Sequence, residues 1–120
     1  GMMQAIAEGI ELLKTKSEYK LDISEIVDNW KEGSVIKSWL IDLISDELNN
    51  DKNLDNFSSN VDDSGEGRWT IEESIELGVP TPVITAALFA RFRSRQANPI
   101  SSKVLSAMRK GFGGHEVKNG

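Results

Sequence analysis

Hydrophobic residues recur at intervals of three and four positions along most of the chain, which is the spacing of one face of an α-helix. The first stripe consists of Met2, Met3, Ile6, Ile10 and Leu13. It begins at the start of the chain, with no N-cap residue before it. We therefore predict that this stripe belongs to a helix that starts further upstream, in a longer protein.

Two further helices are predicted after this stripe. Asp22 is a candidate N-cap and Glu25 follows three residues later, an arrangement typical of a capping box. The next helix is predicted from about Ser34 to Leu48. Its apolar residues cover more than one face, so we expect this helix to be deeply buried and Trp39 to lie in the core.

The second half of the chain shows the same helical period between glycine and proline breaks. Thr70 and Glu73 form a second capping box, which predicts a helix that ends at Gly78. Pro80 and Pro82 suit the first turn of the helix that follows, because their missing N–H groups cost little there.

A last helix is predicted from Ser101 or Ser102 to about Gly111. The chain shows no alternation typical of strands and no internal repeat. At 120 residues it fits one domain and is long enough to bury a core. These patterns together predict an all-α fold, a single multi-helix domain over residues 1–120.

Composition narrows the class of protein. The chain has no cysteine, which excludes disulfides, a cysteine-ligated zinc and a thiol nucleophile. No stretch approaches the roughly 20 apolar residues that span a bilayer, and a reducing cytoplasm is the simplest compartment. The formal net charge of −5 argues against nucleic-acid binding. We therefore expect a cytoplasmic protein without a metal, a membrane anchor or a nucleic-acid partner.

Basic residues nevertheless gather towards the C-terminus, while acidic residues crowd positions 42–63. The basic residues are Arg91, Arg93, Arg95, Lys103, Arg109, Lys110 and Lys118. A basic end on an acidic chain suits a discrete anion such as a phosphate ester. The alternative interpretation is a solvated helix face.

The segment Gly65–Thr70 combines residue types that could bind such an anion. Its two glycines allow a close backbone approach to a ligand. Thr70 offers a hydroxyl and backbone amides at a predicted helix N-terminus, and Arg68 adds a positive charge beside it. A capped helix with a surface arginine explains the same residues.

Two other segments are candidates for the same anion. Arg91 and Arg95 lie one turn apart and share a helix face, which suits bidentate contacts or, alternatively, complements the helix dipole. The glycine-rich segment from Arg109 to His115 contains the single histidine. Phe112 could pin this segment to a surface while His115 reaches a ligand, although a frayed terminus has the same composition.

Six segments in order resemble the helical domain of the 6-phosphogluconate dehydrogenase family, in its shorter bacterial form. They are Gly1–Leu13, Trp30–Leu40, Gly65–Thr70, Gly78–Pro80, Phe89–Arg91 and Arg109–His115. The resemblance covers nearly the whole chain. It implies a C-terminal helical domain without its nucleotide-binding domain, which in this family binds NADP or NAD.

The resemblance also implies roles for individual residues. Arg68, Thr70 and Arg91 match positions that bind the phosphate of 6-phosphogluconate in the family. Arg109 and His115 match positions that reach the partner subunit's active site, so the resemblance implies a homodimer or a higher homo-oligomer. The family's catalytic lysine and glutamate would lie before Gly1. On this resemblance we expect the chain to contain no catalytic residue of its own and to be inactive in isolation.

On this interpretation the full-length protein oxidatively decarboxylates 6-phosphogluconate to ribulose 5-phosphate in the pentose phosphate pathway and in gluconate utilization. The main alternative is a helical dimerisation module of a related beta-hydroxyacid dehydrogenase with a different substrate. The sequence leaves open NAD against NADP and dimer against tetramer, since the residues that decide the cofactor lie in another domain.

Overall fold

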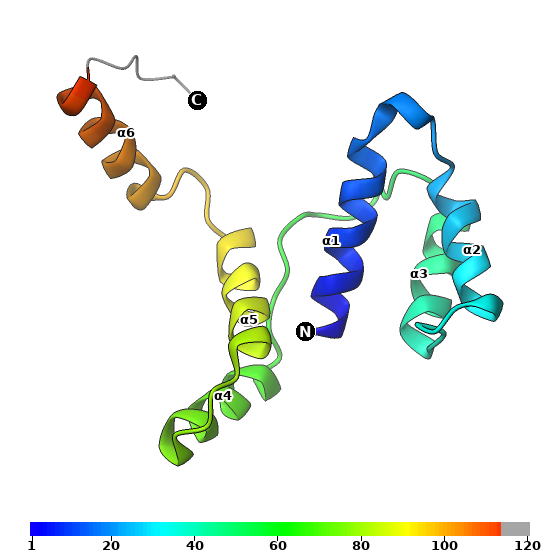
Figure 1. Ribbon diagram of the computed structural model, residues 1–120, viewed down its shortest axis with the longest axis horizontal. Coiled ribbons are helices and arrows are strands. Elements are labelled where there is room, and N and C mark those ends of the chain that lie inside the picture. Colours follow the sequence, from blue (N-terminus) through cyan, green and yellow to red (C-terminus); the bar gives the residue numbers. More distant parts are fainter. Residues whose placement is uncertain (114–120) are drawn as a thin grey trace.

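The computed structural model of the chain describes residues 1–113, and this part contains helices and no strand (Figure 1). The elements are α1 (Met2–Thr15), a short 3₁₀ turn η1 (Ser17–Tyr19), α2 (Ile23–Gly33), α3 (Trp39–Asn50), α4 (Glu66–Leu77), α5 (Pro82–Ser94) and α6 (Ile100–Gly113). The predicted all-α fold is confirmed. Within the described residues, no helix is long and apolar enough to cross a bilayer.

The helices form an open, flat arrangement. The principal extents are 53 × 45 × 24 Å and the radius of gyration is 18.4 Å, against about 14 Å for a compact domain of this length. Figure 1 shows α1 beside the hairpin of α2 and α3, a separate hairpin of α4 and α5, and α6 pointing away from both. Many large apolar side chains are consequently exposed.

The hydrophobic core lies between α2 and α3. Its buried members are Ile23, Val27, Ile41 and Leu48. The α1 stripe packs against this cluster through Ile6, Ile10 and Leu13, each only partly buried. The stripe predicted from the sequence is therefore the face that packs on the hairpin.

Helix α2 begins as predicted, but α3 does not. The Asp22 carboxylate accepts a hydrogen bond from the backbone N–H of Glu25. The predicted start at Ser34 is wrong, because Ser34 has an extended backbone and residues 34–38 form a turn. Helix α3 starts at Trp39, where the Ser38 hydroxyl accepts from the N–H of Ile41 at 3.3 Å.

The predicted deep burial of this region is also wrong. Val35 and Ile36, which widened the apolar face in the sequence pattern, lie in the turn and are exposed. Trp39 is 78% exposed and is not a core residue. Helix α3 therefore buries one face, led by Ile41 and Leu48.

Helix α4 also starts earlier than predicted. Its N-cap is Gly65, whose φ of 107° lies in the left-handed region that glycine tolerates. A Cβ at Gly65 would lie 2.9 Å from the indole of Trp69, so the ring packs directly on this glycine. The predicted capping box at Thr70 is wrong, because Thr70 lies inside the helix and donates to the Glu66 carbonyl at 2.8 Å. The predicted end at Gly78 is confirmed by its left-handed φ of 67°.

The last two helices differ from the prediction at their ends. Pro82 occupies the first turn of α5 with Thr81 as N-cap, so Pro80 lies outside the helix. Helix α6 continues past Gly111 to Gly113. Arg109 and Phe112 are thus helical residues.

Candidate functional site

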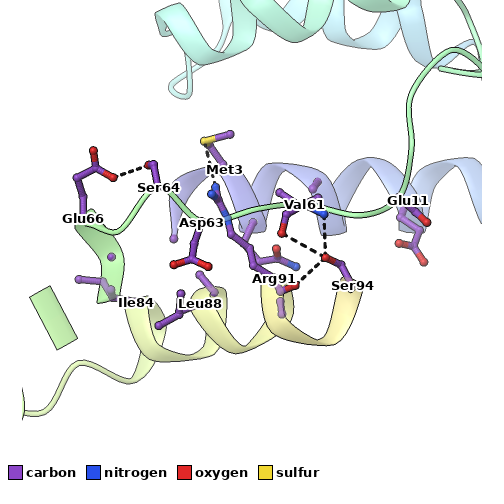
Figure 2. A pocket seen from close by; sticks show the side chains of 17 residues that line it. Met3, Glu11, Val61, Asp63, Ser64, Glu66, Ile84, Leu88, Arg91 and Ser94 are labelled. Carbon is purple, nitrogen blue, oxygen red and sulfur yellow. Dashed lines mark hydrogen bonds between the residues drawn. The ribbon is translucent and has the colours of Figure 1, made fainter. Parts of the chain in front are cut away.

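A cavity of about 650 Å³ separates α1 from α5. The segment 59–64, which leads into α4, closes one side of it, and Figure 2 shows the lining side chains. Both apolar and charged residues line the cavity, among them Met3, Leu88, Asp63 and Arg91. The cavity therefore combines an apolar wall with a small number of charged groups, which is typical of a ligand site.

Arg91 is the predicted site residue that lines this cavity. It rises from α5 towards α1, between the 61–64 segment and Met3 (Figure 2). Its Nη1 donates to the Asp62 carbonyl at 3.0 Å, and its Nη2 lies 3.9 Å from the Met3 sulfur. A sulfur is a weak acceptor, so this second edge of the guanidinium can exchange it for a stronger one.

Arg68 and Arg95 bind the same carboxylate. Arg68 donates through Nε and Nη2 to the two oxygens of Asp63, at 3.2 and 3.3 Å. Arg95 donates through Nη2 to Oδ1 of Asp63 at 3.2 Å and through Nη1 to the Val61 carbonyl at 2.7 Å. The two guanidinium groups therefore meet at one oxygen atom.

The ring of Phe92 supports both of these guanidinium groups. The Arg68 Cζ lies 5.0 Å and the Arg95 Cζ 5.5 Å from the ring centroid, within the range of cation–π contacts. Phe92 is itself stacked on Phe89, with ring centroids 5.8 Å apart. These contacts restrict where the two arginine heads can lie.

The ion pairs keep these groups charged. Hydrogen bonds from Arg68 hold the pKa of the Asp63 carboxyl below its usual range, and Arg95 lowers it further. The same contact with Asp63 raises the pKa of Arg68. Three guanidinium groups thus bond to residues 61–63, a segment that carries only two carboxylates. Further carboxylates lie nearby, Glu11 and Glu66 in the cavity lining and Glu72 close to Arg68, so the surroundings of the arginines carry both signs of charge.

The structure brings some predicted residues together and not others. Arg68 and Arg91 both contact the 61–63 segment. Thr70 does not line the cavity, and its hydroxyl is bonded to the Glu66 carbonyl. Arg109 is exposed on α6, which points away from α1 and from both hairpins (Figure 1), and it does not line the cavity. His115 lies outside the described residues.

Asp63 was not identified from the sequence. Its partners are five and 32 positions away, so no helical period connects the three residues. The available signal was a pair of aspartates directly before a glycine turn, in a chain with clustered arginines. The shared face of Arg91 and Arg95 was predicted, and their contacts with one segment confirm it, while Arg93 bonds elsewhere, to the Gln96 carbonyl.

The described residues do not fit a dinucleotide site. Such sites use the crevice at the carboxyl ends of parallel strands, with the pyrophosphate at the start of the following helix. Residues 1–113 contain no strand. Nor do they place three His, Asp or Glu side chains so as to hold a metal ion.

Comparison with known proteins gives a consistent relationship. Residues 1–101 match the family described as 6-phosphogluconate dehydrogenase, C-terminal domain. The chain is 41% identical over 118 residues to a Bacillus subtilis protein named "Putative 6-phosphogluconate dehydrogenase YqeC", covering 98% of the chain and 39% of that protein. It is 37% identical over 117 residues to the NAD(+)-dependent, decarboxylating 6-phosphogluconate dehydrogenase of Haloferax volcanii, covering 97% and 39%.

A third relative is the decarboxylating 6-phosphogluconate dehydrogenase of Lactococcus lactis, 34% identical over 123 residues. That alignment covers 95% of the chain and 26% of the relative. The chain thus spans two fifths or less of the length of the curated relatives named here.

Proposed function

The chain belongs to the 6-phosphogluconate dehydrogenase C-terminal domain family, and we propose that residues 1–120 are the helical domain that binds the phosphate of 6-phosphogluconate. The observation that carries this proposal is the convergence of three arginines on residues 61–63, beside a cavity of about 650 Å³. The full-length protein is proposed to be an oxidative decarboxylase that forms ribulose 5-phosphate with NAD or NADP, in the pentose phosphate pathway of the cytoplasm.

In this proposal the domain contributes position and charge. Arginine offers a planar fork of N–H donors that matches phosphate oxygens, and its charge persists at any physiological pH. Arg91 lies at the cavity wall with one edge on a weak sulfur acceptor, so a phosphate can replace that contact. Anchoring the remote phosphate orients the sugar carbons and lets binding energy lower the barrier at the reacting carbon.

We also propose that the remaining predicted residues complete the site. Thr70 would add a hydroxyl donor once its bond to the Glu66 carbonyl is exchanged. Arg109 and His115 would come from a second copy of the chain. The conformation of α4 and the position of α6 would then differ when substrate and the second copy are bound.

A homodimer or a higher homo-oligomer is proposed from the surface of α6. One face of this helix carries exposed apolar residues, namely Ile100, Val104, Leu105, Met108 and Phe112. Ile100, Val104, Met108 and Phe112 follow one another every four positions, and Leu105 lies beside Val104, so the five residues form one stripe. Among the helix pairs of the described chain, none of the closest contacts involves α6. An unpaired apolar stripe of this kind is typical of a surface that packs against another chain.

The experiment that tests the function is a nicotinamide-reduction assay on the full-length protein, with 6-phosphogluconate and with unphosphorylated gluconate. Arg91→Ala should lower kcat/KM for the phosphate ester by about 10- to 100-fold, because it removes a hydrogen bond between charged groups. The matched control is Arg93→Ala on the same helix, which bonds to the Gln96 carbonyl and should change kcat/KM less than about twofold.

Equal activity on both substrates would contradict the phosphate site and favour a related beta-hydroxyacid dehydrogenase. Equal effects of Arg91→Ala and Arg93→Ala would also contradict it. The 120-residue chain alone is expected to reduce no NAD or NADP in the same assay. Turnover above a blank by that chain would refute the division of roles proposed here.

A further inference from the structure

We propose that Arg95 is a further phosphate-binding residue and that Asp63 is the positioning residue that orients Arg95 and Arg68 towards the bound phosphate. This inference rests on the proposed function: Arg68 and Arg95 do not themselves line the cavity, but they bond to Asp63, which does. It starts from the observation that two guanidinium groups share one carboxylate oxygen.

The number of guanidinium groups distinguishes this cluster from an ordinary ion pair. Two guanidinium groups share the single carboxylate of Asp63 here, although Glu72 also lies close enough to act on Arg68. Arg91 adds another guanidinium on the neighbouring residue Asp62, where it bonds to the backbone carbonyl. Three guanidinium forks on one short segment offer a phosphate several N–H donors at once, which a single salt bridge does not.

The exposure of the Asp63, Arg68 and Arg95 side chains indicates which of them a ligand from solvent can contact. The Asp63 side chain is 12% exposed, while the side chains of Arg68 and Arg95 are 48% and 30% exposed. An anion that approaches from solvent therefore meets the guanidinium groups first, with the carboxylate behind them. This order suits a carboxylate that holds arginines in place and does not itself contact the ligand.

The arginine heads keep donors that Asp63 and Val61 do not use. A guanidinium carries five N–H donors, and the bonds described use two on each arginine. Within the described residues, the others stay open to a further acceptor. A phosphate presents three terminal oxygens, which a pair of adjacent arginine forks can contact together.

The Phe92 ring makes the pair a preformed site. Both guanidinium groups lie over this ring, and Asp63 restricts their rotation by accepting from Arg68 at both oxygens and from Arg95 at Oδ1. Arginine side chains otherwise lose conformational entropy when they bind a ligand. Groups that are already held in place lose less, so Asp63 should strengthen phosphate binding even though it carries the same sign of charge.

The test uses the full-length dehydrogenase and two readouts that report on the phosphate site separately. The first is the KM for 6-phosphogluconate together with kcat. The second is the dissociation constant of inorganic phosphate, measured by phosphorus NMR titration without turnover. The variants are Arg95→Ala, Arg95→Lys and Asp63→Asn, with Arg93→Ala as the matched control, and each is first checked for an unchanged thermal unfolding midpoint.

Arg95→Ala should raise both the KM and the phosphate dissociation constant by about 10-fold, with kcat within about twofold. Arg95→Lys keeps the charge without the fork and should recover part of this loss. Asp63→Asn should raise both constants by about threefold or more, because it frees the two heads without removing them. Arg93→Ala should leave both constants unchanged.

If Arg95→Ala and Asp63→Asn fold normally and leave both constants unchanged, the cluster only fastens the 61–63 segment and the inference is wrong. If Arg95→Ala and Asp63→Asn are too unstable to test, Arg95→Lys decides. A folded Arg95→Lys that binds phosphate as tightly as the wild type would also contradict the inference, because the arginine fork would then contribute nothing. A wild-type enzyme that binds phosphate through Arg95 but does not use 6-phosphogluconate would refute the proposed substrate and support this inference. A wild-type enzyme that binds no phosphate would overturn both.

Discussion

Val27 and Val35 offer the same chemical change at two opposite levels of burial. Val27 lies on α2 and is fully buried, in the cluster it shares with Ile41 and Leu48. Val35 lies in the turn that follows α2 and is fully exposed. Replacing each by alanine removes the same two methyl groups, so the difference between the variants reports the packing between α2 and α3.

The expected magnitude follows from the burial. Two methyl groups removed from a buried site cost about 1.6 kcal/mol of transfer free energy, and the cavity left behind adds to this. Alanine is a better helix former than valine by roughly 0.5 kcal/mol, which offsets part of the loss at Val27. Val27→Ala should therefore lower the free energy of unfolding by about 2 kcal/mol, while Val35→Ala should change it by less than about 0.5 kcal/mol.

The assay is urea unfolding of the 120-residue chain, followed by far-ultraviolet circular dichroism. With a slope of about 2 kcal/mol per molar urea, the midpoint of Val27→Ala should fall by about 1 M at an unchanged slope. The midpoint of Val35→Ala should stay close to that of the wild type. Equal shifts for the two variants would refute the reasoning, because they would mean that α2 and α3 do not enclose Val27.

Two further predictions concern the start of α4 and the α2–α3 hairpin. Gly65→Ala should lower the thermal unfolding midpoint, because an alanine there would have a left-handed backbone and would meet the Trp69 ring. The expected loss in the free energy of unfolding is about 1–3 kcal/mol. Gly67→Ala is the control: it has open space around it and should raise the midpoint slightly. Hydrogen bonds from Ser45 and then Asn49 lower the pKa of Asp28 in the folded chain. The stability that this carboxylate contributes is therefore present above about pH 4 and lost as the pH falls through the lower folded pKa. Urea unfolding at several acidic pH values should show that Asp28→Asn loses less stability on acidification than the wild type. An equal loss of stability in the two proteins would contradict the assignment.

The parts of the fold that the sequence predicted are those that depend on local pattern. The α1 stripe, the Asp22 N-cap and the Gly78 helix end each rely on residues within a few positions of one another. The start of α3 could not be chosen in this way. Ser34 and Ser38 are both acceptable N-caps, and the decision between them comes from packing Ile41 against α2, which is a tertiary contact.

The candidate site was predictable to a similar extent. The spacing of Arg91 and Arg95 places them on one face of a helix, and the structure agrees. The role of Asp63 could not be predicted from the sequence, because Asp63 bonds to one arginine of α4 and one of α5, which come together only in the folded chain. Helix α4 starts at Gly65, which has a left-handed backbone and packs against the Trp69 ring. The capping pattern at Thr70 and Glu73 predicts a later start, so this N-cap could not be predicted from local pattern.

The closest helix contacts of the described chain join neighbours in the sequence, α1 with α2, α2 with α3, and α4 with α5. Contacts of this kind close short loops, and chains dominated by them fold in microseconds to milliseconds. The α2–α3 hairpin, with its buried core and the bond from Ser45 to Asp28, can form before α5 has left the ribosome. The two hairpins can therefore fold separately, while the apolar stripe of α6 stays exposed on the folded chain.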